Sequence, residues 1–223
     1  MVAMADSHWV RWHEAYADPA SPLSVRLGLV QAALRCALDE AAPGPVRVLS
    51  LCAGQGRDVI DVVAGHDRAA DVTAVLVELD PALVAFARDR AATVGVEVSV
   101  VEGDAGRCAV WAAGVPAEVV LACGLFGNIS EADLVRTVAA LPGVCPPGGS
   151  VIWTRHRRPP DRTPLVREAF AAAGFEEVSF EAPPAPYVLA VGWHRRRPSG
   201  PAPVPFDPGA VLFEFVGDGD RPA

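Results

Sequence analysis

Short apolar runs alternate along this chain with segments whose apolar residues recur at helical spacing. The runs predict strands at residues 46–51, 72–77, 96–101, 118–123, 150–154, 177–181 and 187–193. The helical spacing predicts helices at residues 22–40, from 59 onward, at 81–93, at 131–141 and at 163–174. Strands that alternate with helices are typical of a parallel sheet with helices on both faces.

Capping residues mark where these helices begin. Ser21 and Asp80 each stand directly before a proline, the arrangement of an N-cap followed by the first helical residue. Ser130 followed by Asp133 resembles a capping box, and Thr163 precedes another proline. Few residues separate the last two strands, so they should pair antiparallel. The pattern predicts an α/β fold with a Rossmann-like, seven-stranded, mostly parallel sheet, helices on both faces and an antiparallel C-terminal strand pair.

The same pattern divides the chain into three parts. Residues 45–197 carry the predicted sheet, and residues 1–44 precede it as a helical segment that we expect to form a lid. Residues 198–223 form a tail rich in proline and glycine. Within this tail, residues 211–216 are apolar enough to dock back on the body as an edge strand.

Aromatic residues gather near the N-terminus of a chain that has few of them. Trp9, Trp12 and Tyr16 lie close to His13 in a predicted short helix over residues 6–18. Because this segment precedes the first strand, it is free to cover the substrate side of a ligand site, exclude water and set substrate shape. The alternative is that the tryptophans pack on the outside of the sheet, far from the ligand.

The composition narrows the class of partner. The formal net charge is −8 at pH 7, and every basic residue is arginine. An acidic chain without a long basic stripe argues against nucleic acid as the main partner. The five cysteines are scattered without a CxxC pair, which indicates free thiols in a reducing compartment and no zinc site. Since we find no signal peptide and no apolar run long enough to span a bilayer, we expect a soluble, cytoplasmic protein without a membrane partner.

The first predicted strand ends in a glycine turn that opens a helix. Gly54 and Gly56 follow the apolar run 46–51, and apolar residues return at helical spacing from Val59. A strand, a glycine turn and a helix together direct backbone N–H groups at a ligand beyond the strand's carboxyl end. A dinucleotide fingerprint requires a third glycine where Val59 stands, so this turn favours a different nucleotide-type ligand.

Polar or small residues at three later strand ends complete a pattern that resembles the class I S-adenosylmethionine-dependent methyltransferases over residues 45–195. The segment 50–56 lies where that family has its acidic-x-Gly-x-Gly-x-Gly turn. The resemblance implies that Glu78 accepts both ribose hydroxyls, which suits a carboxylate, and that Asp104 accepts from the adenine amino group. The residues that the resemblance assigns to S-adenosylmethionine are Ala53, Gly54, Gly56, Asp58, Glu78, Leu79, Asp104, Ala105, Cys123 and Gly124.

These assignments leave alternatives open. Glu78 is otherwise a solvated charge at a strand end, and Asp104 otherwise only forms a turn. Asp58 either meets the ligand's ammonium group or only favours the N-terminus of its helix. Ser50 and Cys52 stand where the family has an acid and a glycine, so the first motif departs from the family's pattern at the residues that precede the methionine end of the ligand.

Methyl transfer is an in-line displacement at a carbon activated by a sulfonium, so the protein mainly supplies proximity and orientation. A general base is needed only when the acceptor's proton has a high pKa. The candidate bases are His156, which follows the fifth strand, and His13 and Tyr16 in the predicted lid; each otherwise packs, caps or faces solvent. The residues predicted to contact the substrate are Trp12, Phe126 and Asn128.

We therefore predict a methyltransferase that acts on a small molecule, such as one of specialised metabolism, with S-adenosylmethionine as cofactor and no metal. Two alternatives stay open. The fold could bind S-adenosylmethionine for chemistry other than methyl transfer, which the altered first motif permits. The chain could also be a regulatory subunit that binds the cofactor without turnover. The acceptor atom and the oligomeric state are not determined by the sequence.

Overall fold

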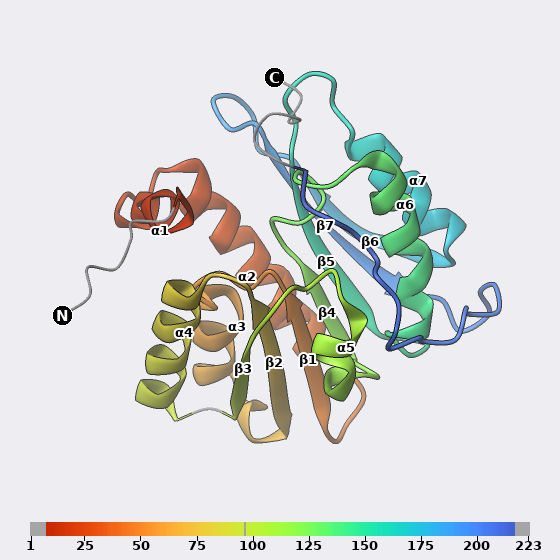
Figure 1. Ribbon diagram of the computed structural model, residues 1–223, viewed down its shortest axis with the longest axis horizontal. Helices are drawn as coiled ribbons and strands as arrows, with labels where there is room; N and C mark the ends of the chain where they lie inside the picture. The colour runs from red at the N-terminus through yellow and green to blue at the C-terminus, as the bar shows by residue number, and fades with distance from the viewer. Residues whose placement is uncertain (1–7, 96, 217–223) are drawn as a thin grey trace.

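The computed structural model describes residues 8–95 and 97–216, which form one sheet with helices on both of its faces (Figure 1). The strands lie in the order β3-β2-β1-β4-β5-β7-β6. They are β1 (Val46–Leu51), β2 (Val72–Glu78), β3 (Val98–Glu102), β4 (Val119–Ala122), β5 (Ser150–His156), β6 (Phe175–Glu181) and β7 (Leu189–Arg196). The first five strands are parallel, and β7 pairs antiparallel with both β5 and β6. The predicted fold class is confirmed.

The helices follow the strands as the apolar spacing predicts, with one addition. They are α1 (His8–His13), α2 (Pro22–Glu40), α3 (Arg57–Ala64), α4 (Pro81–Val94), α5 (Cys108–Trp111), α6 (Glu131–Ala140) and α7 (Thr163–Ala172). Short 3-10 helices, η1 (Glu14–Ala17), η2 (Ala69–Asp71), η3 (Ala112–Gly114) and η4 (Leu141–Gly143), extend or connect them. The single turn α5 is too short to produce a periodic pattern, which is why the sequence did not predict it. No helix among the described residues is long and apolar enough to cross a membrane.

Three of the predicted caps form the hydrogen bonds expected of them. The side-chain oxygen of Ser21 accepts from Ser24 N at 3.1 Å, which satisfies a backbone donor that the first turn leaves unpaired. Asp80 Oδ1 accepts from Ala82 N at 2.9 Å, and Ser130 Oγ accepts from Asp133 N at 3.0 Å. These caps fix where α2, α4 and α6 begin, and so set the lengths of the loops that precede them.

Two apolar cores lie on the two faces of the sheet. The first contains Val30 and Leu34 of α2 with Val59 and Val63 of α3, packed against β1 and β2. The second contains Phe170 of α7, packed with residues of α5 and α6 against the other face. Burial of these side chains provides most of the free energy that holds the layers together. The carboxyl ends of the parallel strands are thereby fixed at a common edge.

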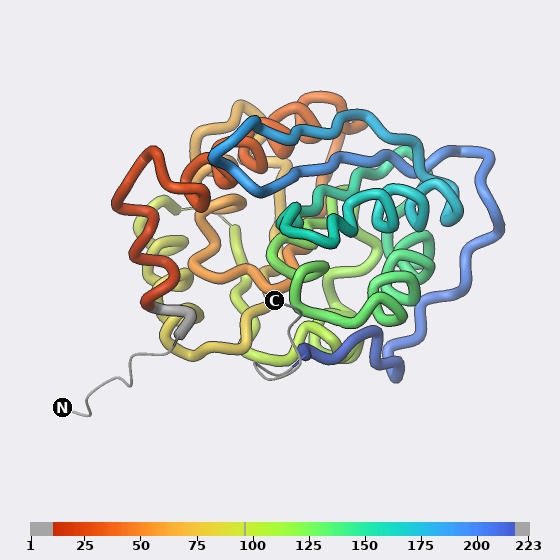
Figure 2. Tube along the Cα trace, turned by 90° about the horizontal axis from the view of Figure 1, so that it is seen from above, coloured from red at the N-terminus to blue at the C-terminus, as the bar shows by residue number. Residues whose placement is uncertain are grey.

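The C-terminal tail docks on the body, but not as an edge strand. Only isolated bridges form there, between Arg107 and Val211 and between Ile129 and Phe215. The prediction of an edge strand at 211–216 is therefore wrong. The tail packs over the loops beside α5 and α6, where Cys108 N donates to Ala210 O and Val216 N donates to Asn128 O. Figure 2 shows the tail as the blue segment.

Alanine substitutions at two glycines test the packing, because they should change the free energy of unfolding in opposite directions. A Cβ at Gly192 of β7 would lie 2.5 Å from Cζ2 and Nε1 of Trp153, whose ring crosses this glycine, so Gly192→Ala should lower the free energy of unfolding by about 1–3 kcal/mol. Gly28, in the middle of α2, has nothing within 4 Å of the same position, so Gly28→Ala should raise it by about 0.5–1 kcal/mol. Denaturant unfolding of both variants measures this, and equal changes would contradict the packing described.

Candidate functional site

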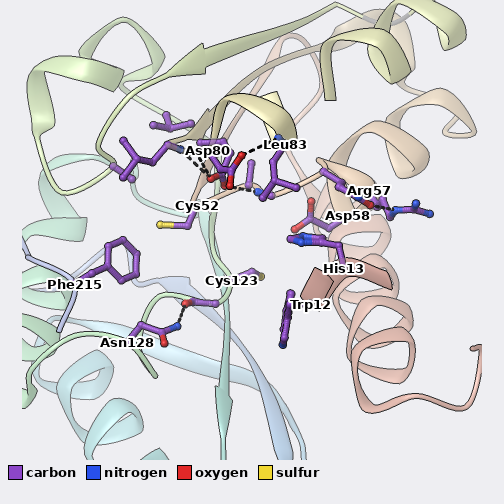
Figure 3. Close-up of a pocket in the computed structure, with 18 of the residues that line it drawn as sticks. Trp12, His13, Cys52, Arg57, Asp58, Asp80, Leu83, Cys123, Asn128 and Phe215 are labelled. Carbon is purple, nitrogen blue, oxygen red and sulfur yellow. Dashed lines mark hydrogen bonds between the residues drawn. The ribbon is translucent and has the colours of Figure 1, made fainter. Parts of the chain in front are cut away.

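A cavity of about 430 Å³ opens where the parallel strands end (Figure 3). The loops that follow β1, β2, β3 and β4 line it, which is the place where open parallel sheets bind ligands. Two segments outside the sheet complete its wall. They are the N-terminal part of the chain, through Trp12, His13 and Tyr16, and the C-terminal tail, through Phe215.

The turn between β1 and α3 forms the wall of the cavity nearest α3. Its backbone enters the left-handed region at Cys52, Gly54 and Gly56, with φ of 61°, 56° and 66°. A Cβ at Gly54 would lie 2.6 Å from His13 Nε2, so glycine lets the histidine ring rest on the turn. Cys52 is the one non-glycine residue with positive φ within the described ranges, and this conformation costs roughly 1–2 kcal/mol. It stands where a glycine was expected.

Glu78, at the end of β2, holds this turn in place. Its Oε2 accepts from Gly54 N at 2.7 Å, and its Oε1 accepts from Leu79 N and Asp80 N, each at 2.9 Å. Burial raises the pKa of the Glu78 carboxyl, and the three N–H donors oppose that rise. The carboxylate is half-buried and lines the cavity, where lone pairs of both oxygens can accept further O–H donors.

Asp104 and Ala105, which follow β3, lie on the adjoining wall. Asp104 Oδ1 accepts from Gly106 N at 2.9 Å, and its Oδ2 lies 3.5 Å from Arg107 Nε. The carbonyl of Ala105 accepts from Trp111 Nε1 at 2.9 Å, which ties the loop to α5. Asp104 therefore forms a turn and also lines the cavity, so the two interpretations of this residue are compatible.

Opposite charges line the cavity near the start of α3. Asp58 of α3 is largely buried, and this burial raises the pKa of its carboxyl to about 6. The guanidinium of Arg26, on α2, lowers that pKa and lies 4.9 Å from the centre of the Trp12 ring. Tyr16 also lines the cavity, and burial raises the pKa of its hydroxyl. Arg57, the first residue of α3, lines the cavity as well, so this end offers one carboxyl and two guanidinium groups to a ligand.

Two thiols and an amide lie at the ends of β1 and β4. Burial raises the pKa of the Cys52 and Cys123 thiols well above the ordinary value, so both are protonated at neutral pH. Gly124 N donates to Thr154 Oγ1 at 2.9 Å, and Asn128 Nδ2 donates to Gly124 O at 2.6 Å. These bonds orient the loop after β4 so that Cys123, Gly124 and Asn128 line the cavity.

Most of the predicted site residues line this one cavity, and three do not. Gly56 supports the turn from behind, because a Cβ there would lie 2.7 Å from side-chain atoms of Ile60 and Leu76. Phe126, predicted to contact substrate, is fully buried in the second core, 6.2 Å between ring centres from Trp153. Its side chain turns into the protein after the left-handed turn at Gly124.

His156, predicted as a general base, is the third residue that does not line the cavity. It belongs to β5, which extends two residues further than predicted because His156 pairs with Leu189 of β7. Its ring lies beside Gly127, where a Cβ would be 3.2 Å from Cδ2. Burial lowers the pKa of this imidazole, and the charges of Arg155 and Arg158 lower it further. The general-base assignment therefore loses its geometric support, whereas His13 and Tyr16 keep theirs.

Some cavity residues were not predicted at all. Arg26 lies on α2, where the sequence pattern predicted only the apolar face, and Phe215 lies in the tail. Aromatic character in the tail was the one available signal for Phe215. Ser50, at the position where an acid was expected, does not line the cavity. It is fully buried, and its Oγ has no hydrogen-bond partner in the part of the chain that the structure describes. Within that part, no group of three His, Cys, Asp or Glu side chains could hold a metal ion.

Comparison with known proteins links this architecture to a family. Residues 48–149 match the model of a family described as a methyltransferase domain. No curated protein matches the sequence. The magnesium protoporphyrin IX methyltransferase from Synechocystis PCC 6803, solved with bound S-adenosylmethionine, is 13% identical, with a TM-score of 0.67 over 86% of this chain and 92% of that chain.

Two further solved structures have the same fold. A structure named as a possible O-methyltransferase from Nostoc punctiforme PCC 73102 is 17% identical, with a TM-score of 0.62 over 84% of this chain and 60% of that chain. The [4+2]-cyclase SpnF is 16% identical, with a TM-score of 0.55 over 75% of this chain and 80% of that chain. At these identities the likeness shows the fold, which proteins of different chemistry share.

The buried carboxyl of Asp58 makes stability depend on pH in a defined direction. Because its pKa of about 6 in the folded protein exceeds the ordinary 3.8, the folded state binds the extra proton between these values, and its stability falls as pH rises through them. Asp58→Asn should therefore gain stability over the wild type, from about zero at pH 4 to about 1–3 kcal/mol at pH 7. Urea unfolding at both pH values measures this, with exposed Asp89→Asn as control. A gain that does not change with pH would contradict the burial of this charge.

Proposed function

Residues 48–149 match the model of a methyltransferase domain, and on that premise we propose that the protein is a class I methyltransferase that transfers a methyl group from S-adenosylmethionine to a small-molecule acceptor. The observation that carries the proposal is the convergence of Glu78, Asp104 and the glycine turn on one cavity. These groups come from three different strand ends, so a single elongated ligand can meet all of them at once.

The cofactor's nucleoside end would lie along the ends of β2 and β3. Glu78 is held by three backbone N–H groups and can still accept from the two ribose hydroxyls. Asp104 Oδ2 is available to the adenine amino group, because the nearby Arg107 is an exposed ion-pair partner that contributes little. Leu79, 60% exposed despite its apolar side chain, can cover one face of the base.

The methionine end would lie between Asp58 and Arg26. S-adenosylmethionine carries an ammonium and a carboxylate there, and these two side chains offer the opposite charges on one side of the cavity. An ammonium beside Asp58 would lower the raised pKa of that carboxyl and remove the cost of its burial. This interpretation assigns Asp58 a ligand contact in place of a role at the helix N-terminus alone.

Methyl transfer requires the protein mainly to position the acceptor relative to the cofactor's methyl group. The acceptor's lone pair displaces the sulfur in line, so a defined distance and angle, together with exclusion of water, are what the cavity must supply. An acceptor that must lose a proton would meet His13 or Tyr16, which line the cavity. The raised pKa of the Tyr16 hydroxyl makes it a poor base at neutral pH, which favours His13.

A second candidate is chemistry other than methyl transfer on the same cofactor-binding fold. It is favoured by the fold that the chain shares with a [4+2]-cyclase and by Cys52 in place of a turn glycine. Incubation with S-adenosyl-[methyl-¹⁴C]methionine and a library of small acceptors separates the two. Transfer of label, with release of S-adenosylhomocysteine, supports the methyltransferase. Cofactor-dependent conversion of an acceptor without label transfer supports the alternative.

Ribose recognition can be tested on two glutamates that face each other across neighbouring strands. Glu78 and Glu102 are register partners at the ends of β2 and β3, but only Glu78 lines the cavity. Glu78→Ala should weaken S-adenosylhomocysteine binding by about 1.5–3 kcal/mol, roughly 10- to 150-fold, whereas exposed Glu102→Ala should leave it unchanged. Calorimetry measures both, and NAD should not bind. Unchanged affinity in a folded Glu78→Ala variant would show that the ribose is held elsewhere.

The N-terminal segment can be tested as a lid. The rings of Trp12 and Tyr16 lie 4.9 Å from the guanidinium carbons of Arg26 and Arg57, respectively, which ties the segment to the cavity wall. A chain that lacks residues 1–18 should fold, bind S-adenosylhomocysteine and release it at least several-fold faster, because the cover over the turn is gone. Stopped-flow displacement measures the release rate. A release rate equal to that of the full chain would place these aromatics outside the path of the ligand. Trp9 has a side chain outside the described residues.

A further inference from the structure

We propose that the C-terminal segment 198–216 is a strap that builds part of the acceptor site, and that Phe215 and Trp12 form two aromatic walls that select a flat, apolar acceptor. The inference rests on the proposed function, because it assigns the part of the cavity that the cofactor would leave open. It gives the tail a role in choosing the substrate.

The strap packs closely against three glycines on the body of the protein, where a side chain would clash with it. A Cβ at Gly174 would lie 2.6 Å from Pro201, and one at Gly143 would lie 3.1 Å from Phe206 N. At Gly106, next to the cavity, a Cβ would overlap the carbonyl oxygen of Phe213. Close backbone approach at three successive places along the body is what an integral segment requires, and a loose tail does not need it. Figure 2 shows the strap passing around the side of the molecule toward α5.

Hydrogen bonds fix the end of the strap beside the cavity. Leu212 N donates to Gly106 O at 2.8 Å, and Arg136 Nε donates to Leu212 O at 2.9 Å. Val216 N donates to Asn128 O at 2.9 Å, so the residues on both sides of Phe215 are held. The side chain of Leu212 is buried, and that of Phe213 is completely buried. These contacts leave Phe215 little freedom to move away from the cavity.

Phe215 itself is left 40% exposed and faces the cavity. Its ring meets that of Phe213 edge to face, at 5.6 Å between centres and 84° between planes, which fixes its orientation. A large apolar ring that is held at a cavity mouth, and that residues 8–95 and 97–216 leave partly exposed, points to a ligand that covers it. Its entropic cost of binding is already small, because the ring is ordered before the ligand arrives.

Trp12 and Phe215 lie on opposite sides of Cys123 and Asn128 in the cavity (Figure 3). The labelled charged residues Asp58, Arg57 and Asp80 lie on the side of the glycine turn, away from Asn128. Between the two aromatic rings the cavity is lined by the protonated thiols of Cys52 and Cys123 and by the amide of Asn128. The guanidinium of Arg26 lies 4.9 Å from the centre of the Trp12 ring. Asn128 Nδ2 donates a hydrogen bond to Gly124 O, so the amide oxygen of Asn128 is the group that would accept from a ligand hydroxyl or amine. A flat ring with one polar substituent matches these surroundings.

The test uses 2-naphthol as a flat probe and decahydro-2-naphthol as its puckered, saturated analogue, with the full chain at saturating S-adenosylhomocysteine. Calorimetry should show that 2-naphthol binds several-fold more tightly than the analogue. Phe215→Ala should weaken 2-naphthol binding roughly tenfold, with Phe215→Leu between, and should change the affinity for S-adenosylhomocysteine less than twofold. Val211→Ala, on the same strap but away from the cavity, should behave as wild type. Thermal melts establish that each variant is folded.

Three results would overturn the inference: no 2-naphthol binding, equal affinity for the two probes, or 2-naphthol binding unaffected by Phe215→Ala. A loss of S-adenosylhomocysteine affinity as large as the loss for 2-naphthol would also overturn it, by placing Phe215 on the cofactor. Failure of the wild type to bind S-adenosylhomocysteine would instead contradict the proposed function. Repeating the probe titrations without S-adenosylhomocysteine keeps the two failures distinct, since aromatic walls would still prefer the flat probe.

Discussion

One carboxylate joins the ends of two neighbouring strands, and the site depends on it. Glu78 Oε2 accepts from the backbone of the glycine turn after β1, while its Oε1 accepts from two N–H groups that lead into α4. Ala53 N, one residue before Gly54, donates to Val77 O at 2.9 Å, so the turn is fixed to β2 at two successive residues. A left-handed turn has no regular partners of its own, and these bonds replace them. The wall that faces the ligand is thus rigid before any ligand binds.

The turn after β1 keeps its conformation although Ser50 and Cys52 differ from the family's first motif. Cys52 adopts the backbone conformation that a glycine would take, and its thiol lines the cavity where a glycine would leave space. Ser50 remains inside the sheet, paired in register with Leu76 and Leu121. The position of the family's acid therefore does not line the cavity, and Asp58, in the first turn of α3, is the carboxyl that lines it on this side. In the proposed binding mode, Asp58 supplies the negative charge for the ligand's ammonium group.

The parts of the fold that could be predicted are those that depend on local pattern. Apolar runs, helical spacing and caps such as Ser21, Asp80 and Ser130 act within a few residues, so they can be read from the sequence. The strand-end carboxylates Glu78 and Asp104 line one cavity because every parallel strand ends at the same edge of the sheet, which also follows from the order of the elements.

What failed depended on contacts between distant segments. His156 was expected in a loop, but pairing with Leu189 of β7 extends β5 through it. Phe126 was expected beside substrate, but the left-handed turn at Gly124 precedes a reversal that buries it against α7. Arg26 and Phe215 reach the cavity from segments outside the predicted nucleotide-binding region. The local sequence does not predict how such segments pack, because their packing depends on the surfaces that they contact.

A crystal structure of the protein grown with S-adenosylhomocysteine would show whether this cavity holds the cofactor along the ends of β1, β2 and β3. We expect ligand density in the cavity, with both ribose hydroxyls on Glu78, the adenine amino group on Asp104 and the amino-acid end between Asp58 and Arg26. Density elsewhere on the protein, or an empty cavity at saturating ligand, would contradict this expectation.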